Sequence, residues 1–172
     1  MWVRQPTRLA STVASISPVW FLGAPLGGTN QLSCTIPASK MILAPAATFL
    51  NDYPCPDPSF EPAPGQTLEV FLTQGVTPII DSFSSAVELD GHPLKLHRVT
   101  ADLQSFTGAK DIGFPKSGDP VDACVTGSPQ LAVADGQYAM IGPLSPGLHI
   151  LHIHVNSSKF GSGDNTFRLT IK

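Results

Sequence analysis

The chain has 172 residues, of which 42% are hydrophobic and 13% are charged, and its formal net charge at pH 7 is −3. This length predicts a single domain over residues 1–172, with a core large enough to fold without metals or disulfides. The ten Lys and Arg residues are scattered, whereas a nucleic-acid surface needs them clustered, so the charge pattern argues against a nucleic-acid partner. No long apolar run occurs, which argues against a transmembrane helix.

The N-terminal stretch from Trp2 to Phe21 contains no acidic residue and carries Arg4 and Arg8. Such a composition loosely matches an organelle transit segment, but it lacks the apolar region of a secretory signal. The interpretation that we favour is a mature domain behind an added Met. Residues 1–17 would then form an extended arm or the remnant of a leader.

Short strand-like runs, separated by Gly, Pro, Asn or Asp, recur along the chain. These runs are Val19–Leu22, Gln31–Ile36, Met41–Leu43, Ala86–Leu89, Leu94–Val99, Gln130–Val133, Tyr138–Gly142, Leu148–Val155 and Thr166–Ile171. The turn signals between them include Asp90-Gly91, Asp135-Gly136, Pro146-Gly147 and Gly161–Gly163. About nine short strands with this spacing predict an all-β fold, an antiparallel β-sandwich that is similar to a jelly roll.

One segment departs from the strand pattern. A short helix is expected near residues 68–75, because Thr67 is a suitable N-cap and Leu68 and Leu72 would share one face. Gly75 is expected to end this helix, because glycine is a common helix stop. The alternative is a strand with Leu68, Val70 and Leu72 on the same face.

Three cysteines allow one internal disulfide at most. Cys34 lies in an apolar strand-like run and is expected to be a buried, inert thiol. Cys55 and Cys124 lie in loop-like surroundings, so we predict a disulfide between them. This bond would indicate an oxidising compartment.

Three of the five histidines lie within the segment from Gly147 to Val155. Successive side chains of a strand alternate between its two faces, so His152 and His154 are expected on one face and His149 on the other. Two imidazoles on one stiff strand can supply two ligands of a metal site. His149 is expected to be structural, beside the Pro146-Gly147 turn.

The segment from Ala134 to Ile153 resembles the C-terminal hairpin of a family of largely uncharacterised secreted or periplasmic β-rich proteins, which reads approximately ADGYWVMLKPLSPGEHTIHFGG. Three further blocks are similar to this family: Pro18–Gly23, Ser33–Lys40, and Asp90-Gly91 followed by His97–Val99. The resemblance implies an extracytoplasmic β-rich fold and carries no assigned activity.

The chain departs from this family at two histidines. His154 stands where the family tends to have a small residue, and His97 stands where it tends to have Tyr. The family often has a cysteine upstream of the Val-Trp-Phe block. This chain has none there, which leaves the usual partner of Cys34 open.

A zinc or copper site would need a third ligand beside His152 and His154. His97 is the first candidate and His92 the second. In a hydrolytic or redox metalloenzyme, Asp102 or Glu88 would be the candidate general base. The interpretation that we favour is that these histidines are ordinary surface or hydrogen-bonded residues.

Two other groups of residues offer weaker sites. Asp111, Asp119 and Asp122 have the hard oxygen ligands that calcium prefers, but their spacing matches no calcium loop, so a solvated polar loop is favoured. A sugar-stacking platform would need exposed aromatic rings, whereas most of the aromatics are expected in the core. The platform residues considered are Trp20, Phe21, Tyr53, Phe60 and Tyr138.

The sequence thus predicts a secreted or periplasmic binding module for a small molecule or glycan, with organelle targeting as the weaker alternative for its location. The alternative function is a small metal-binding protein or metalloenzyme that uses His97, His152 and His154 with zinc or copper. The two functions differ in whether the purified chain holds a metal ion.

Overall fold

The structure is a computed structural model and describes residues 18–23, 28–108 and 122–172. The expected arm or leader at residues 1–17 lies outside the described residues, as do Asp111 and Asp119. In the described part, no helix is both long enough and apolar enough to cross a membrane.

Nine strands and one helix occur within these described ranges. In chain order they are β1 (Val19–Phe21), β2 (Gly28–Ile36), β3 (Met41–Tyr53), α1 (Leu68–Asp81), β4 (Phe83–Leu89), β5 (His92–Pro93), β6 (His97–Thr107), β7 (Pro129–Ile141), β8 (Gly147–Ser157) and β9 (Gly161–Ile171).

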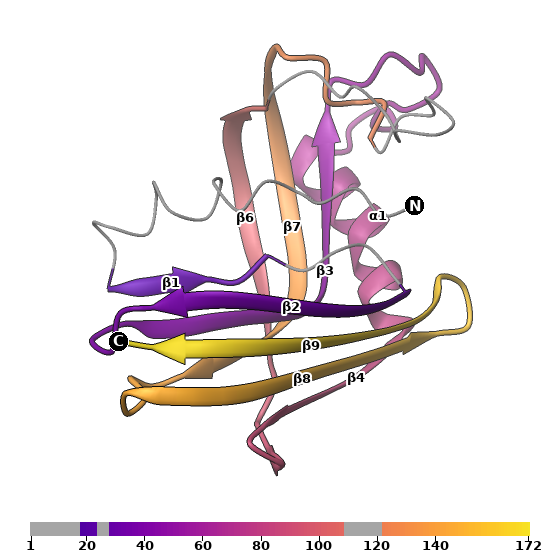
Figure 1. Cartoon of the computed structure of the whole chain (residues 1–172). Coiled ribbons are helices and arrows are strands. Elements are labelled where there is room, and N and C mark those ends of the chain that lie inside the picture. The colour runs from indigo at the N-terminus through magenta and orange to yellow at the C-terminus, as the bar shows by residue number, and fades with distance from the viewer. Residues whose placement is uncertain (1–17, 24–27, 109–121) are drawn as a thin grey trace, which may run out of the picture. The chain divides into compact units, whose positions relative to one another are not determined.

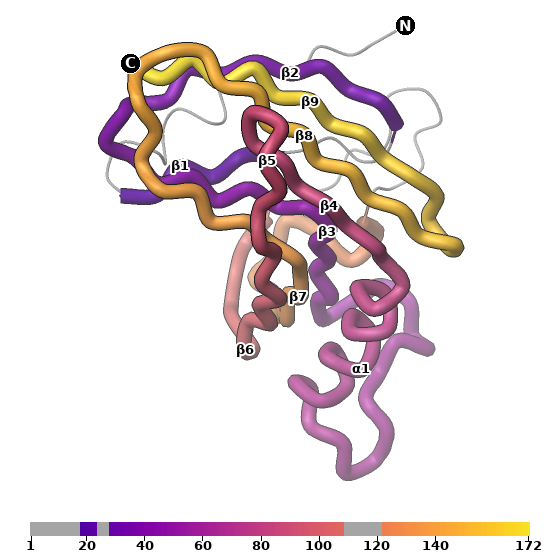
Figure 2. The backbone as a smooth tube through the Cα atoms, turned by 90° about the horizontal axis from the view of Figure 1, so that it is seen from below, coloured from indigo at the N-terminus to yellow at the C-terminus, as the bar shows by residue number. Residues whose placement is uncertain are grey.

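The strands form two mixed sheets. The five-stranded sheet has the order β2-β9-β8-β4-β5, and its first four strands lie side by side in both views (Figures 1 and 2). The four-stranded sheet has the order β1-β3-β7-β6. The predicted all-β sandwich is confirmed, but β1 runs parallel to β3 and β2 runs parallel to β9. A long chain segment separates β2 from β9, which permits a parallel pairing that a tight hairpin does not.

The described residues divide into two compact units. Unit 1 comprises the described residues up to Ala47 together with Ser82–Arg98 and Gln137–Lys172. Unit 2 comprises Thr48–Asp81 and the described residues from Val99 to Gly136. The strands β3, β6 and β7 contribute residues to both units. The expectation that the chain folds as one domain stays a prediction.

The core of unit 1 lies between the two sheets, and both sheets contribute to it. Alternate residues of each strand point inward, which is the pattern of a sandwich. The buried cluster consists of Leu22, Ile36, Ile42, Ala44, Val87, Ala139, Ile141, Leu151, Ile153, Phe167, Leu169 and Ile171. On β8 this alternation buries Leu151 and Ile153 and leaves the histidines between them exposed.

The core of unit 2 forms around α1. Leu72 and Val76, four residues apart on one helix face, are fully buried together with Val133 of β7. The predicted helix is confirmed over the strand alternative. The Thr67 side chain caps it, because its Oγ1 accepts a hydrogen bond from the Val70 amide at 3.3 Å.

Helix α1 does not stop at Gly75 as predicted but continues to Asp81. A β-carbon at position 75 would collide with the side-chain amide of Asn51. That amide donates a hydrogen bond of 2.9 Å to the backbone oxygen of Leu72. The glycine therefore permits close packing in the helix interior and is not a cap.

Two turn predictions have different outcomes. Asp90 and Gly91 form the two-residue turn between β4 and β5, with φ angles of 52° and 79° that such hairpin turns require. The turn expected at Asp135-Gly136 is wrong, because β7 runs through it and Asp135 is fully buried. Strands β3 and β6 pair with β7 on its two sides and hold it extended.

Candidate functional site

Strand β8 presents two histidines on the outer face of the five-stranded sheet. His152 and His154 are exposed, whereas Leu151 and Ile153 are buried. The prediction that these histidines share a face is confirmed. The rigid support comes from β4 and β9, which pair with β8 on its two sides.

Each of these histidines has a partner on β9. The Nδ1 atom of His154 lies 2.7 Å from the Oδ1 atom of Asp164, and the Nδ1 atom of His152 lies 3.1 Å from the hydroxyl of Thr166. An ionised carboxylate only accepts, so the proton of a neutral His154 is on Nδ1 and its Nε2 has a free lone pair. Among the described residues neither Nε2 atom has a hydrogen-bond partner.

The strand register adds two carboxylates to this outer face. His152 stands opposite Glu88 of β4, and His154 stands opposite Asp164 of β9. Directly opposite residues have β-carbons about 4.5–5.5 Å apart. Glu88, one of the two predicted general-base candidates, is thus the cross-strand neighbour of His152.

The structure does not bring His97 into this group. His97 begins β6 in the four-stranded sheet, whereas His152 and His154 belong to the five-stranded sheet. The described residues contain one group of three ligand side chains whose ligand atoms all lie within 4.8 Å of one another, and it contains no histidine. His92, the second candidate, is exposed at the start of β5. A site made of the three predicted histidines stays a prediction.

His149 lies near the start of β8 and forms hydrogen bonds with residues of two turns. Its Nδ1 lies 2.7 Å from Oδ2 of Asp90, and its Nε2 lies 3.0 Å from the backbone oxygen of Ser145. Both ring nitrogens face acceptors, so the imidazolium form satisfies both. The hydrogen bonds that His149 donates to Asp90 and Ser145 accordingly raise the pKa of His149. The amide of Ile150 and the ring of His149 lower the pKa of Asp90. These contacts agree with the structural role predicted for His149.

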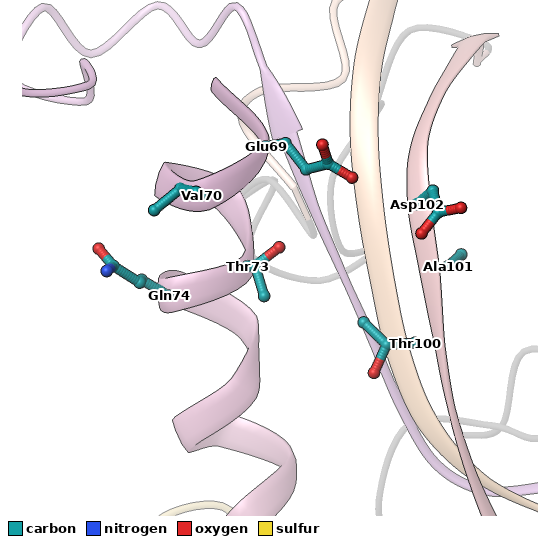
Figure 3. Close-up of a pocket in the computed structure, with 7 residues that line it drawn as sticks. All are labelled: Glu69, Val70, Thr73, Gln74, Thr100, Ala101 and Asp102. Atoms are coloured by element: carbon teal, nitrogen blue, oxygen red, sulfur yellow. The ribbon is translucent and has the colours of Figure 1, made fainter. Parts of the chain in front are cut away.

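A groove of about 350 Å³ lies in unit 2 between α1 and β6 (Figure 3). Its lining consists of Glu69, Val70, Thr73 and Gln74 from the helix and Thr100, Ala101 and Asp102 from the strand. Figure 3 shows Glu69 and Thr73 projecting from α1 toward β6 and Thr100 projecting toward the helix. The amide of Leu103 donates a hydrogen bond of 3.4 Å to the Glu69 carboxylate, which links the two walls.

Of these residues, only Asp102 was predicted from the sequence as a functional residue, in the role of a general base. The helical spacing of Glu69 and Thr73, four residues apart, was the one local signal available. Their alignment with Thr100 and Asp102 depends on packing between segments that lie about thirty residues apart in the chain.

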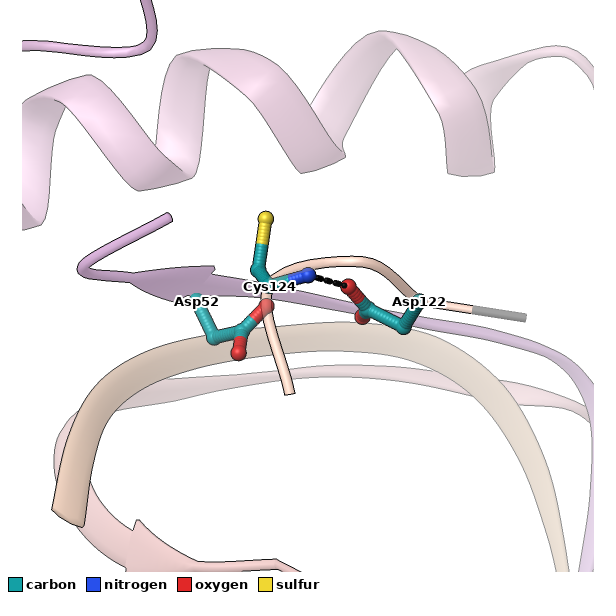
Figure 4. Close-up of side chains that lie close together, drawn as sticks. All are labelled: Asp52, Asp122 and Cys124. Atoms are coloured by element: carbon teal, nitrogen blue, oxygen red, sulfur yellow. Dashed lines mark hydrogen bonds between the residues drawn. The ribbon is translucent and has the colours of Figure 1, made fainter. Parts of the chain in front are cut away.

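The predicted disulfide between Cys55 and Cys124 is confirmed. It closes a loop with a sequence separation of 69 residues in unit 2. Beside it lie the carboxyl groups of Asp52 and Asp122 (Figure 4). Burial, followed by the negative charge of Asp122, raises the pKa of Asp52 to about 6. The sequence did not predict this pair, because 70 positions separate the two residues.

The third cysteine has no disulfide partner. Cys34 is half-buried, and burial raises the pKa of its thiol to about 11. The thiol is therefore protonated at neutral pH and is a weak nucleophile. The prediction of an inert Cys34 agrees with this environment.

The five aromatic residues considered for a sugar-stacking platform divide between the two units. Trp20 packs against the core of unit 1, and Tyr53 and Phe60 pack against the core of unit 2. Phe21 is 55% exposed. The expectation that most of these rings belong to the core is confirmed for three of the five.

Comparisons of the chain with models of protein families, with curated proteins and with solved structures found no match.

Proposed function

We propose that the protein is an extracytoplasmic binding module that holds a small polyhydroxylated ligand, or part of a glycan, in the groove between α1 and β6. The observation that carries this proposal is the polar lining of that groove. Glu69 and Asp102 supply carboxylates, and Thr73 and Thr100 supply hydroxyl groups.

This lining suits hydroxyl groups better than anionic groups. A carboxylate only accepts hydrogen bonds, and the hydroxyls of a sugar can donate them. None of the seven lining residues is basic, so the groove has no countercharge for a phosphate or an acidic sugar. The methyl groups of Val70 and Ala101 provide apolar contacts for the C–H groups of a sugar ring. The volume of about 350 Å³ is at the small end of the usual range for ligand sites.

The extracytoplasmic location is supported by the disulfide. Disulfides persist in oxidising compartments and are rare where thiols are kept reduced. The acidic balance of the chain, with 13 Asp and Glu against 10 Lys and Arg, supports a partner other than a polyanion. Targeting to an oxidising organelle is the alternative location.

The groove is tested by NMR titration of the labelled chain with neutral mono- and oligosaccharides. We expect a binding saccharide to shift the amide signals of Thr73, Thr100 and Asp102. Asp102→Asn should weaken binding roughly tenfold or more, because a hydrogen bond to a charged group contributes about 1.5–3 kcal/mol.

Glu61→Gln is the matched control for the groove, since Glu61 is an exposed carboxylate of unit 2 outside the lining. This variant should bind like the unmodified chain. The proposal fails if no saccharide at about 10 mM, a concentration that detects even weak sites, shifts the groove signals. It also fails if Asp102→Asn binds as tightly as the unmodified chain.

A second candidate function is the binding of zinc or copper on the outer face of β8. The hydrogen bonds from Nδ1 of His152 and His154 to β9 favour this function, because they orient the rings and leave both Nε2 atoms facing outward. Metal-ligating histidines commonly have such a partner on the second ring nitrogen. Glu88, opposite His152, would supply a third ligand after a side-chain rotation.

Metal analysis of protein purified without a His-tag tests this second function. After incubation with zinc or copper and desalting, we expect a bound metal ion that His152→Ala removes. Asn156→Ala, on the same face of β8, is the control and should retain the metal. Less than about a tenth of an equivalent in the unmodified chain contradicts the function, since protein metal sites bind tightly. Retention of the metal in His97→Ala would contradict the prediction that His97 is the third ligand beside His152 and His154.

A further inference from the structure

Several oxygen atoms converge on the side chain of Gln130 in unit 2. Its Nε2 atom lies 2.7 Å from Oδ2 of Asp52, 2.6 Å from the backbone oxygen of Cys124 and 3.1 Å from that of Pro54. An amide nitrogen has only two hydrogens, so one of these three acceptors lacks a donor from it. The three acceptor oxygens therefore outnumber the two hydrogens of the Gln130 amide.

The other end of the same amide also lacks a partner. Gln130 is only 3% exposed, and its Oε1 atom is buried without a hydrogen bond among the described residues. Rotation of the amide by 180° would exchange the nitrogen and oxygen positions. Four oxygens would then face one another with no donor between them. Neither orientation of Gln130 satisfies all the polar atoms, whereas a cation among these oxygens would.

Asp122 adds a second carboxyl group to this site. Its side chain forms a hydrogen bond with Asp52, which needs a proton on one of the two carboxyl groups. The Cys124 amide donates to Oδ1 of Asp122 at 2.9 Å and orients it (Figure 4). No Lys, Arg or His is among the groups that shift the pKa of Asp52. Among the described residues, no cationic side chain therefore neutralises Asp52, which is buried.

We propose that Asp52, Asp122 and the Gln130 amide oxygen, together with the backbone oxygens of Pro54 and Cys124, bind a calcium ion. The space that Nε2 of Gln130 now fills lies 2.6–3.1 Å from three of these oxygens. Calcium–oxygen distances are about 2.3–2.6 Å, so a calcium ion in this space requires the Gln130 side chain to withdraw by about that distance and to turn its amide oxygen toward the ion.

The ligand set distinguishes calcium from other metals. The sulfur of Cys124 belongs to the disulfide and points away from the two carboxyl groups, so the site has no thiolate for zinc or copper (Figure 4). Carboxylates mixed with backbone and amide oxygens are typical calcium ligands, whereas magnesium prefers strict octahedral geometry and keeps several waters. This inference is independent of the proposed sugar groove.

The experiment is a calcium titration of the full chain after dialysis against EGTA, followed by calorimetry and by thermal unfolding. We expect a dissociation constant of about 10⁻⁴–10⁻³ M, the range of extracellular calcium modules. Saturating calcium should raise the Tm by roughly 5 °C, because a ligand that binds only the folded state stabilises it. Magnesium at the same concentration should raise the Tm much less.

Asp122→Asn separates calcium binding from folding. The variant keeps a side-chain oxygen for the Cys124 amide and removes one of two adjacent negative charges, so it should fold normally without calcium. Its calcium affinity should fall at least tenfold. Asp57→Asn is the matched control, since Asp57 is an exposed carboxylate of the same unit that hydrogen-bonds to Ser59, and it should keep the calcium shift.

Three results would overturn the proposal. The first is no heat of binding and no Tm shift at about 10 mM calcium, a concentration well above the expected dissociation constant. The second is an Asp122→Asn variant with an unchanged calcium response. The third is an equal Tm shift with magnesium, which would indicate charge screening without a calcium site.

Discussion

Removal of the Cys55–Cys124 disulfide lowers the free energy of unfolding by about 4 kcal/mol in the chain-entropy treatment of a crosslink. The sequence separation of the two cysteines is 69 residues, so the unfolded chain without the bond gains the freedom of a long loop. This expected loss is a large fraction of the stability of an ordinary domain.

The measurement is urea unfolding of the double variant Cys55→Ser/Cys124→Ser, compared with the unmodified chain. Cys34→Ser is the control, because Cys34 has no disulfide partner and should change the free energy of unfolding much less. A loss below about 1 kcal/mol in the double variant would contradict the prediction, since native disulfides typically contribute 2–5 kcal/mol. Calcium should be absent, because the same bond holds the backbone of the proposed calcium site.

Leu72→Ala is expected to lower the free energy of unfolding by about 2–5 kcal/mol. Leu72 is fully buried in the core of unit 2, where it packs with Val76 and Val133. Truncation removes apolar contacts and leaves a cavity that the surrounding strands fill only in part. This core holds α1 beside β6, so the same change should weaken ligand binding in the groove.

Val70→Ala is the matched control on the same helix. Val70 is 46% exposed and lines the groove, so its truncation should change the free energy of unfolding by roughly 0.5 kcal/mol or less. Equal losses in the two variants would show that the helix does not pack through Leu72. Hydrogen exchange in Leu72→Ala would also test the single-domain prediction, because one cooperative domain loses protection in both units together.

The groove and the proposed calcium site depend on different elements of the fold. The groove needs α1 and β6 at a fixed separation, and the Leu103–Glu69 hydrogen bond crosses it. The calcium site needs the end of β3, the disulfide and the first residues of β7. Variants at Asp102 and Asp122 can therefore separate the two proposals.

The fold class and the features that depend on neighbouring residues could be predicted from the amino-acid sequence. Alternation along β8 placed His152 and His154 outward because a strand repeats every two residues. The Asp90-Gly91 turn and the Thr67 cap were equally local, since each depends on the conformational preference of one or two residues. The Cys55–Cys124 disulfide could also be predicted, because the chain has only three cysteines and Cys34 lies in an apolar strand-like run.

Features that depend on contacts between distant segments could not be predicted from local sequence patterns. Pairing on both sides keeps β7 extended through Asp135, against its local turn preference. Helix α1 continues past Gly75, where the helix packs closely against Asn51. The composition of the candidate sites also depends on contacts between distant segments. His97 lies in a different sheet from His152, and Asp52 meets Asp122 only through folding. Local patterns report strand faces and turns, whereas contacts between distant segments arise from the packing of whole sheets.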